Sequence, residues 1–239
     1  MTPASNCRPG IHGAQGAELT GMERNLRLIA ALEVTAMTTL ILSYIWGWQR
    51  AFTGAAWLVL LGYFGIGYLG HRIRGETLAH IGLRFDNLRP ALRNAAIVVA
   101  VAAPGAALVG LALNSWRFPS WTAAAATIPV TIAWGTMQQY GLLCVFYRRL
   151  RDLFGSPAIA MFGAASLFAI FHLPNSFLMT VTLFAGAVAC ALYHRVPNVF
   201  AIGVAHALIS FSLLYSLPLD VTKGLRVGPG YFRYVQVLQ

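Results

Sequence analysis

The sequence predicts an all-α protein, a polytopic transmembrane helix bundle of about seven spans, on the strength of three observations. Of its 239 residues, 58% are hydrophobic and only 10% are charged, whereas soluble domains carry roughly 25% charged residues. The mean hydropathy is +0.65. The apolar residues also fall into separate runs, several of which approach the roughly 20 residues that a helix needs to cross the hydrocarbon core.

Seven apolar runs predict the helices, and the second and fifth are the shortest. In chain order they are Leu26–Trp46, Ala55–Gly70, Ala91–Leu113, Trp121–Tyr147, Pro157–His172, Ser176–Tyr193 and Asn198–Leu217. Pro104 and Pro129 lie inside the third and fourth runs, where proline favours a kink because it cannot donate a backbone hydrogen bond.

These runs divide the chain into three parts. We expect a disordered cytoplasmic segment at 1–25, a transmembrane helical domain at 26–218 with a motif-bearing core at 121–218, and a tail at 219–239. The tail is expected to form a turn followed by a short extended piece. The loop 71–93 contains ETLAHIGLRFDNLR, whose amphipathic pattern predicts a position at the membrane interface.

The net charge of +10 fits a membrane protein better than a nucleic-acid-binding one, because the basic residues lie between apolar runs and form no single patch. Seven spans would place twelve of the basic residues on one side of the membrane: Arg8, Arg24, Arg27, Arg72, Arg74, Arg84, Arg89, Arg93, Arg148, Arg149, Arg151 and Arg195. The other side carries five: Arg50, Arg117, Lys223, Arg226 and Arg233. This asymmetry predicts a cytoplasmic N-terminus and an external C-terminus.

Two adjacent glutamines, Gln138 and Gln139, lie within the fourth run, in WGTMQQYGLLCVFYRRLR. A buried amide is costly unless it is hydrogen-bonded, so the pair predicts polar partners in the bundle. The candidates are His172 in FAIFHLPN and His206 in VAHALIS, with Ser210 one turn after His206. Purely structural roles are open too: interhelical bonds for the glutamines, a carbonyl cap for His172, and a neutral His206 bonded to Ser210 or a glutamine.

The fourth and fifth runs predict an antiparallel hairpin, because only a short segment joins them. Positions 138 and 172 are symmetric about Gly155, so Gln138 and His172 can face each other if the fourth helix continues through Arg151. We expect His206 to lie several residues lower, unless the seventh span is tilted or broken.

Glu33 is the only carboxylate within a predicted span. We expect it to lie near Arg27 or to reach outward to the interface, rather than to act in catalysis.

The three cysteines, Cys7, Cys144 and Cys190, show neither a CxxC pattern nor a Cys/His ligand spacing. The sequence therefore indicates neither a disulfide scaffold nor a zinc finger.

Taken in order, these polar segments resemble the CPBP intramembrane proteases, which include the type 2 CAAX prenyl proteases. QQYGLLCVFYRRL stands where that family has EExxxRG; Phe168 and His172 in SLFAIFHLPN resemble its FxxxH motif; His206 in NVFAIGVAHALIS resembles its HxxxN motif. IGLRFDNLRPALR also resembles a segment of bacterial members. The resemblance covers spans four to seven and implies an intramembrane endopeptidase acting on a membrane-associated peptide or protein. It also implies a multi-pass protein of the bacterial inner membrane.

The first motif departs from this pattern. Gln138 and Gln139 stand at the two glutamates, Leu143 at the arginine, Cys144 at the glycine, and Ser210 at the asparagine of the third motif. In the family, the first glutamate and the second-motif histidine activate a water against the scissile carbonyl. An amide cannot accept that proton, and loss of a general base costs roughly 100- to 10,000-fold in rate.

Two functions follow from the resemblance. The first is an endopeptidase with a replaced base, whose catalytic candidates are His172, His206, Gln138, Gln139 and Ser210. A histidine would accept the proton, the glutamines would orient water or hold the oxyanion, and Glu33 is a distant reserve. The second is an inactive relative that binds a peptide or lipid-linked partner in the same pocket, as a regulator, chaperone or immunity-type factor.

A metal or haem site on His172 and His206 ranks below both, because catalytic zinc usually takes three protein ligands. No cofactor is certain from the sequence. A transporter is a further alternative, but intramembrane charges that mark ion paths are almost absent. The expected partners are membrane lipids and a membrane-bound peptide or protein, and no nucleic acid.

Overall fold

The computed structural model describes residues 11–48 and 54–238, and this part of the chain is helical with no strand. The long helices are α1 (Ile11–Ser43), α3 (Ala55–Ile73), α4 (Leu88–Ala112), α5 (Trp121–Gln139), α7 (Pro157–Ile170), α8 (Ser176–Arg195) and α9 (Val199–Ser216). Shorter helices are α6 (Arg148–Phe154), α10 (Leu219–Thr222) and α11 (Gly228–Leu238). Two π-helical stretches, η1 (Tyr44–Trp48) and η2 (Tyr140–Tyr147), and the 3₁₀ turn η3 (Lys223–Leu225) complete the elements. The predicted all-α bundle is confirmed.

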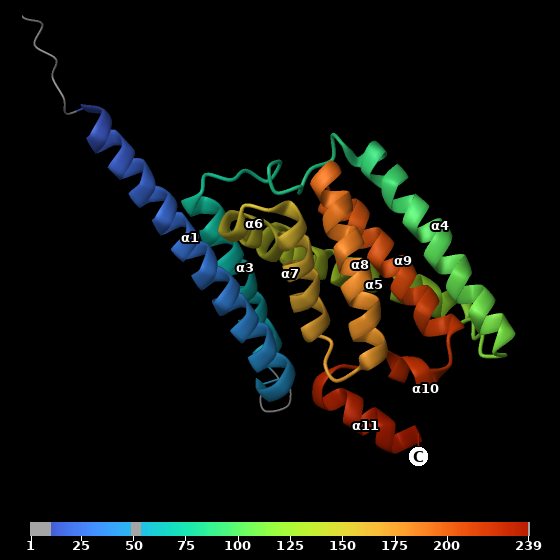
Figure 1. Cartoon of the computed structure of the whole chain (residues 1–239). Helices are drawn as coiled ribbons and strands as arrows, with labels where there is room; N and C mark the ends of the chain where they lie inside the picture. The colour runs from blue at the N-terminus through green and yellow to red at the C-terminus, as the bar shows by residue number, and fades with distance from the viewer. Residues whose placement is uncertain (1–10, 49–53, 239) are drawn as a thin grey trace, which may run out of the picture.

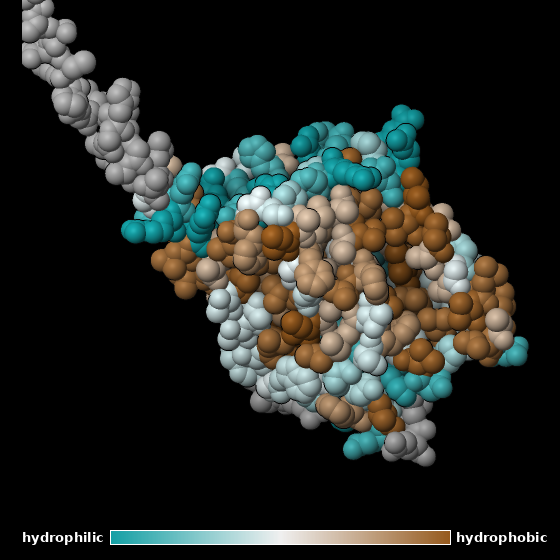
Figure 2. Space-filling model, viewed as in Figure 1, coloured by the Kyte–Doolittle hydropathy of each residue, from teal (hydrophilic) through white to brown (hydrophobic). Residues whose placement is uncertain are grey.

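The helices form two groups that share α5, η2 and α6 (Figure 1). On one side, α1 packs on α3 and α6; on the other, α9 packs between α5 and α4, and α8 packs on α7. The segment 74–87 crosses one end of the bundle, and α10 and α11 lie at the opposite end. Figure 2 shows hydrophilic residues along the first of these ends and hydrophobic residues over much of the visible side of the bundle.

Four helices in the described ranges are long and apolar enough to cross a membrane: Gly21–Trp48, Leu88–Ala112, Ser176–Arg195 and Val199–Ser216. They correspond to the first, third, sixth and seventh predicted spans. The other three predicted spans coincide with α3, with α5 followed by η2, and with α7, which has only 14 residues. The chain is therefore an integral membrane protein with at least four helices of spanning length.

The structure differs from the sequence expectations at both ends. Helix α1 is already helical at Ile11, whereas the apolar run begins only at Leu26. The apolar run therefore predicted only the apolar part of this helix, and the polar part at 11–25 was not predicted. The tail forms α10 and α11, so the expected extended piece is wrong. Residues 1–10, including Cys7, lie outside the described residues.

The loop 74–87 forms no regular helix and is tied into the bundle by the backbone of Ile81. The Ile81 carbonyl accepts hydrogen bonds from the Tyr193 hydroxyl at 2.9 Å and from the Cys144 thiol at 3.0 Å. The carbonyl of Gly82 accepts from the backbone N–H of Val199 at 2.9 Å. These contacts place the start of α9 directly beneath the loop.

Two glycines allow α5 and α9 to approach closely. A Cβ atom built on Gly203 would lie 2.3 Å from Thr136 Oγ1, and one on Gly135 would lie 3.0 Å from the Gly203 carbonyl oxygen and 3.1 Å from His206. Small residues at such contacts let helix backbones pack tightly in a membrane. This packing sets the position of His206 relative to the end of α5.

We predict that Gly203→Ala destabilises the bundle by about 1–3 kcal/mol, the usual cost of forcing a methyl group into a packed interface. Gly65→Ala is the matched control, because no atom lies within 4 Å of a Cβ built there. Thermal unfolding in detergent measures both. The packing assignment fails if the two variants shift the midpoint equally.

Candidate functional site

A cavity of about 840 Å³ is lined by residues of α5, η2, α7, α8 and α9, together with residues of α1, η1, α3 and α4. All five site residues proposed from the sequence line it: Gln138, Gln139, His172, His206 and Ser210. The helix that bears the glutamines continues from α5 through η2 into α6 and ends at Phe154. The condition for Gln138 and His172 to face the same space is therefore met.

His206 is hydrogen-bonded to one of the two glutamines, Gln139. The Gln139 side-chain nitrogen donates to His206 Nδ1 at 3.0 Å, which leaves the proton of a neutral imidazole on Nε2. The expectation that His206 lies several residues lower is wrong. The close α5–α9 contact at Gly135 and Gly203 brings His206 beside Gln139 without a break in α9.

The two glutamines leave buried acceptors without partners. Gln139 is 2% exposed, and among the described residues neither its Oε1 atom nor Gln138 Oε1 has a hydrogen-bond partner. Leaving a buried acceptor unpaired costs about 1–3 kcal/mol. Both residues line the cavity, so donors from a bound molecule would stabilise them.

His172 follows α7, in the turn that precedes α8. Its Nδ1 atom lies 2.6 Å from the Phe168 carbonyl oxygen and donates to it, so the lone pair of the neutral ring is on Nε2. The Phe168 ring lies between the two histidines, with centroid distances of 4.8 Å to His172 and 6.2 Å to His206. His172 thus caps a helix carbonyl, as one sequence interpretation proposed, and also lines the cavity.

The C-terminal tail contributes to the cavity lining, which the sequence did not indicate. Leu225 and Val227 are part of its lining. The Asn175 side chain donates to the carbonyls of Thr222 at 3.0 Å and Arg226 at 3.1 Å. Asn175 also caps α8 through Leu178 N–H. The only available signal was an asparagine immediately after the helix-ending Pro174.

Among the described residues, no charged side chain lines this cavity. The carboxylates of Glu33, Glu76 and Asp152 instead form a separate ionic cluster at the 74–87 end of the bundle, with Arg74, Arg148 and Arg149. Glu33 is buried there. The expectation that it lies near Arg27 or points outward is wrong, because Arg74 and Arg149 hold it inside the bundle at 2.6 and 2.5 Å.

Arg149 is the centre of this ionic cluster and is 1% exposed. Its guanidinium donates to Glu33, and to Glu76 at 2.7 Å. Gly70 makes room for the pair, since a Cβ atom there would lie 2.5 Å from the Glu33 carboxylate. The sequence signal was the arginine pair 148–149, whose buried role hydropathy alone could not reveal.

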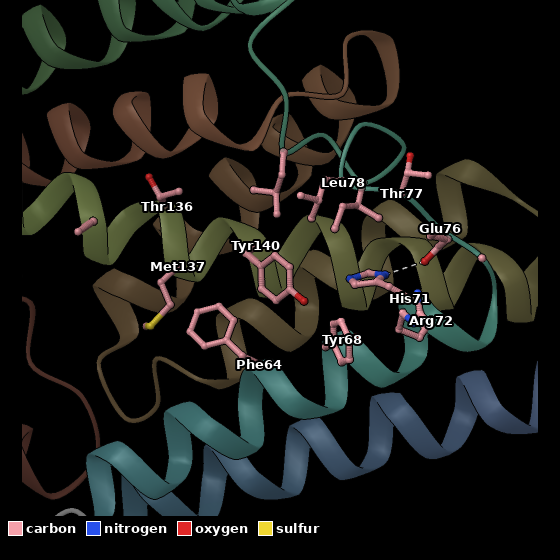
Figure 3. A pocket seen from close by; sticks show the side chains of 14 residues that line it. Phe64, Tyr68, His71, Arg72, Glu76, Thr77, Leu78, Thr136, Met137 and Tyr140 are labelled. Carbon is pink, nitrogen blue, oxygen red and sulfur yellow. Dashed lines mark hydrogen bonds and ion pairs between the residues drawn. The ribbon is translucent and has the colours of Figure 1, made fainter.

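Glu76 is held ionised by its neighbours. Burial alone would raise its pKa, but hydrogen bonds from His71, Arg149 and Arg148 lower the pKa well below its usual value of 4.5. His71 Nδ1 lies 2.7 Å from Glu76 Oε2 (Figure 3). This arrangement commits Glu76 to the arginines rather than to proton transfer.

The two remaining motif positions lie in the apolar core. Leu143 and Cys144, which stand at the motif arginine and glycine, are each 0% exposed. Within residues 11–48 and 54–238, no three His, Cys, Asp or Glu side chains gather in a way that could hold a metal ion.

Comparison with known proteins finds a family model that matches much of the cavity-lining part of the chain. Residues 119–212 match the model of the family described as Type II CAAX prenyl endopeptidase Rce1-like. The matched segment contains Gln138, Gln139, His172, His206 and Ser210. No curated protein and no solved structure matches the chain.

The depressed pKa of Glu76 predicts that stability falls in acid. A carboxylate with a lowered folded-state pKa stabilises the protein above its unfolded pKa, and this contribution is lost as pH falls below about 4.5. Glu76→Gln removes the effect and destabilises the protein at pH 7 by up to about 3–5 kcal/mol, because Arg149 loses a partner. Unfolding midpoints in detergent between pH 7 and pH 3 measure both changes.

Asp86→Asn is the control, since Asp86 pairs with Arg84 at the surface. It should change the midpoint and its pH dependence far less than Glu76→Gln does, because solvent screens an exposed ion pair. Equal acid sensitivity in the native chain and Glu76→Gln would contradict the assignment.

Proposed function

Because residues 119–212 match the Rce1-like family model, we propose that the cavity binds a membrane-associated peptide or protein segment without hydrolysing it by a carboxylate-dependent mechanism. One observation carries this proposal. The described lining of the cavity contains His172 and His206 but no carboxylate. An amide cannot act as general base, and removal of such a base costs about 10²–10⁴-fold in rate.

Two other carboxylates form ion pairs outside the cavity. Glu33 and Glu76 both pair with Arg149, and neither belongs to the cavity lining. Moving either into the cavity would leave the buried Arg149 short of a partner, which costs several kcal/mol. The ionic cluster therefore supports a neutral cavity.

The hydrogen-bonding groups of the cavity suit an extended peptide. The Oε1 atoms of Gln138 and Gln139 are unpartnered acceptors, His206 offers an Nε2–H donor, and His172 offers an Nε2 acceptor. A peptide backbone alternates N–H and C=O groups and can meet such a mixed set. The mostly apolar walls would accommodate its hydrophobic side chains.

A second candidate function is peptide hydrolysis with His172 as the base, and the Nδ1 contact to Phe168 favours it. His172 Nε2 would take a proton from water while the water oxygen adds to the peptide carbonyl carbon. The oxyanion would accept a hydrogen bond from His206 Nε2–H. His172 would then return the proton to the leaving amine as the C–N bond breaks.

We predict that the native chain in liposomes retains photo-reactive hydrophobic peptides intact. Ala185→Trp projects into the cavity and should lower crosslinking about tenfold or more. Ala125→Trp lies on α5 outside the lining and serves as the matched control. Mass spectrometry of the adducts identifies the peptide and any cleavage.

Equal crosslinking in both tryptophan variants would contradict binding in this cavity. Cleavage by the native chain that disappears in His172→Ala would establish the second candidate instead.

A further inference from the structure

A second cavity of about 720 Å³ lies on another face of α5, between α3, α5 with η2, and the loop 74–87 (Figure 3). It shares Met137 with the glutamine-lined cavity but none of the histidines there. Its long walls are apolar and aromatic, formed by Phe64, Tyr68 and Tyr140 on one side and by Leu78 of the loop on the other.

One end of this groove is polar and partly unsatisfied. His71 is 5% exposed and lines the groove; its Nε2 atom is buried and has no partner among the described residues. Its Nδ1 atom lies 2.7 Å from Glu76 Oε2 and 3.0 Å from a guanidinium nitrogen of Arg149. The ionised carboxylate can only accept, so Nδ1–H donates to Glu76, and the Arg149 nitrogen also donates to Glu76. In the neutral ring this places a lone pair on Nε2, which can accept a hydrogen bond from a ligand hydroxyl.

Beside His71, Arg72 supplies an unneutralised positive charge. Its side chain is exposed and lines the groove, and it forms neither an ion pair nor a hydrogen bond within the described residues. The adjacent Glu76 carboxylate is already shared among His71, Arg148 and Arg149. The end of the groove therefore favours an anion next to a hydrogen-bond donor.

The groove is long enough to hold part of a lipid chain. Phe64 to His71 spans about 10 Å along α3 at 1.5 Å per residue, and the parallel edge on α5 runs from Ala133 to Tyr140. Phe64 and Tyr68 line the groove and are both exposed. An acyl chain can enter from the surrounding bilayer, with its headgroup at the polar end.

We propose that this groove binds one anionic glycerophospholipid whose headgroup carries a free hydroxyl, of the phosphatidylglycerol type. The acyl chain packs against Phe64, Tyr68 and Tyr140. The phosphate pairs with Arg72, and the headgroup hydroxyl donates to His71 Nε2. Charge complementarity at Arg72 and the orphaned His71 nitrogen select this occupant over a zwitterionic lipid.

The test is native mass spectrometry of the full-length chain in detergent, titrated with phosphatidylglycerol, phosphatidic acid or phosphatidylcholine. We expect phosphatidylglycerol to bind about tenfold or more tightly than phosphatidylcholine, with phosphatidic acid between them because it lacks the glycerol hydroxyls. In Arg72→Gln, the affinity for phosphatidylglycerol should fall to the affinity for phosphatidylcholine. Ala133→Trp, which fills the apolar end, should weaken all three lipids.

Arg195→Gln is the matched control, because Arg195 is an exposed arginine at the end of α8, away from the groove. It should leave phosphatidylglycerol binding unchanged, and thermal midpoints should show that every variant is folded. Equal retention of the three lipids would overturn the proposal, as would equal losses in Arg72→Gln and Arg195→Gln. Equally tight binding of glycerol 3-phosphate would assign the site to a free phosphate ester and overturn the lipid assignment.

Discussion

The structure depends on the burial of one cation. Arg149 is almost completely enclosed, and an isolated buried charge costs far more than a folded protein can tolerate. Two carboxylates from distant segments, Glu33 of α1 and Glu76 of the loop 74–87, therefore have to meet it. This requirement fixes α1, α3, the loop and α6 relative to one another at one end of the bundle.

The same ion pairing keeps the carboxylates of Glu33 and Glu76 out of the glutamine-lined cavity. Glu33 and Glu76 form ion pairs with Arg149 in the ionic cluster. The described lining of the cavity has no charged side chain and includes two amides and two imidazoles. The imidazoles are oriented by different contacts: His172 by the Phe168 carbonyl and His206 by the Gln139 amide. The two histidines and the two glutamines thus line one cavity, and its described walls contain no carboxylate.

Much of the fold was predictable because hydropathy determines which segments enter the membrane. The run Trp121–Tyr147 coincides with α5 and η2, and Ser176 and Pro157 begin helices as predicted. The relative depth of residues on neighbouring helices was harder to predict. Counting residues placed His206 too low, because the count assumes parallel axes and cannot anticipate the close glycine contact between α5 and α9.

The residues of the candidate site could be predicted from the sequence, but the ion pairs and the tail around it could not. Ordered motifs identified Gln138, Gln139, His172, His206 and Ser210, which all line one cavity. The partnership of Glu33 with Arg149 could not be anticipated, since 116 residues separate them in the chain. The contribution of the tail was also missed, because Asn175 acts through backbone carbonyls whose positions no side-chain pattern reveals.

We propose that the cavity does not hydrolyse peptide bonds because a glutamine, Gln138, stands where the motif has its first glutamate. The most direct measurement compares cleavage of a membrane-peptide library, read by mass spectrometry, for the native chain, Gln138→Glu, and Gln138→Glu combined with His172→Ala. We expect little or no cleavage by the native chain, a gain of about 10²–10⁴-fold in Gln138→Glu, and loss of that gain when His172 is removed. Efficient cleavage by the native chain that Gln138→Glu does not increase would contradict it.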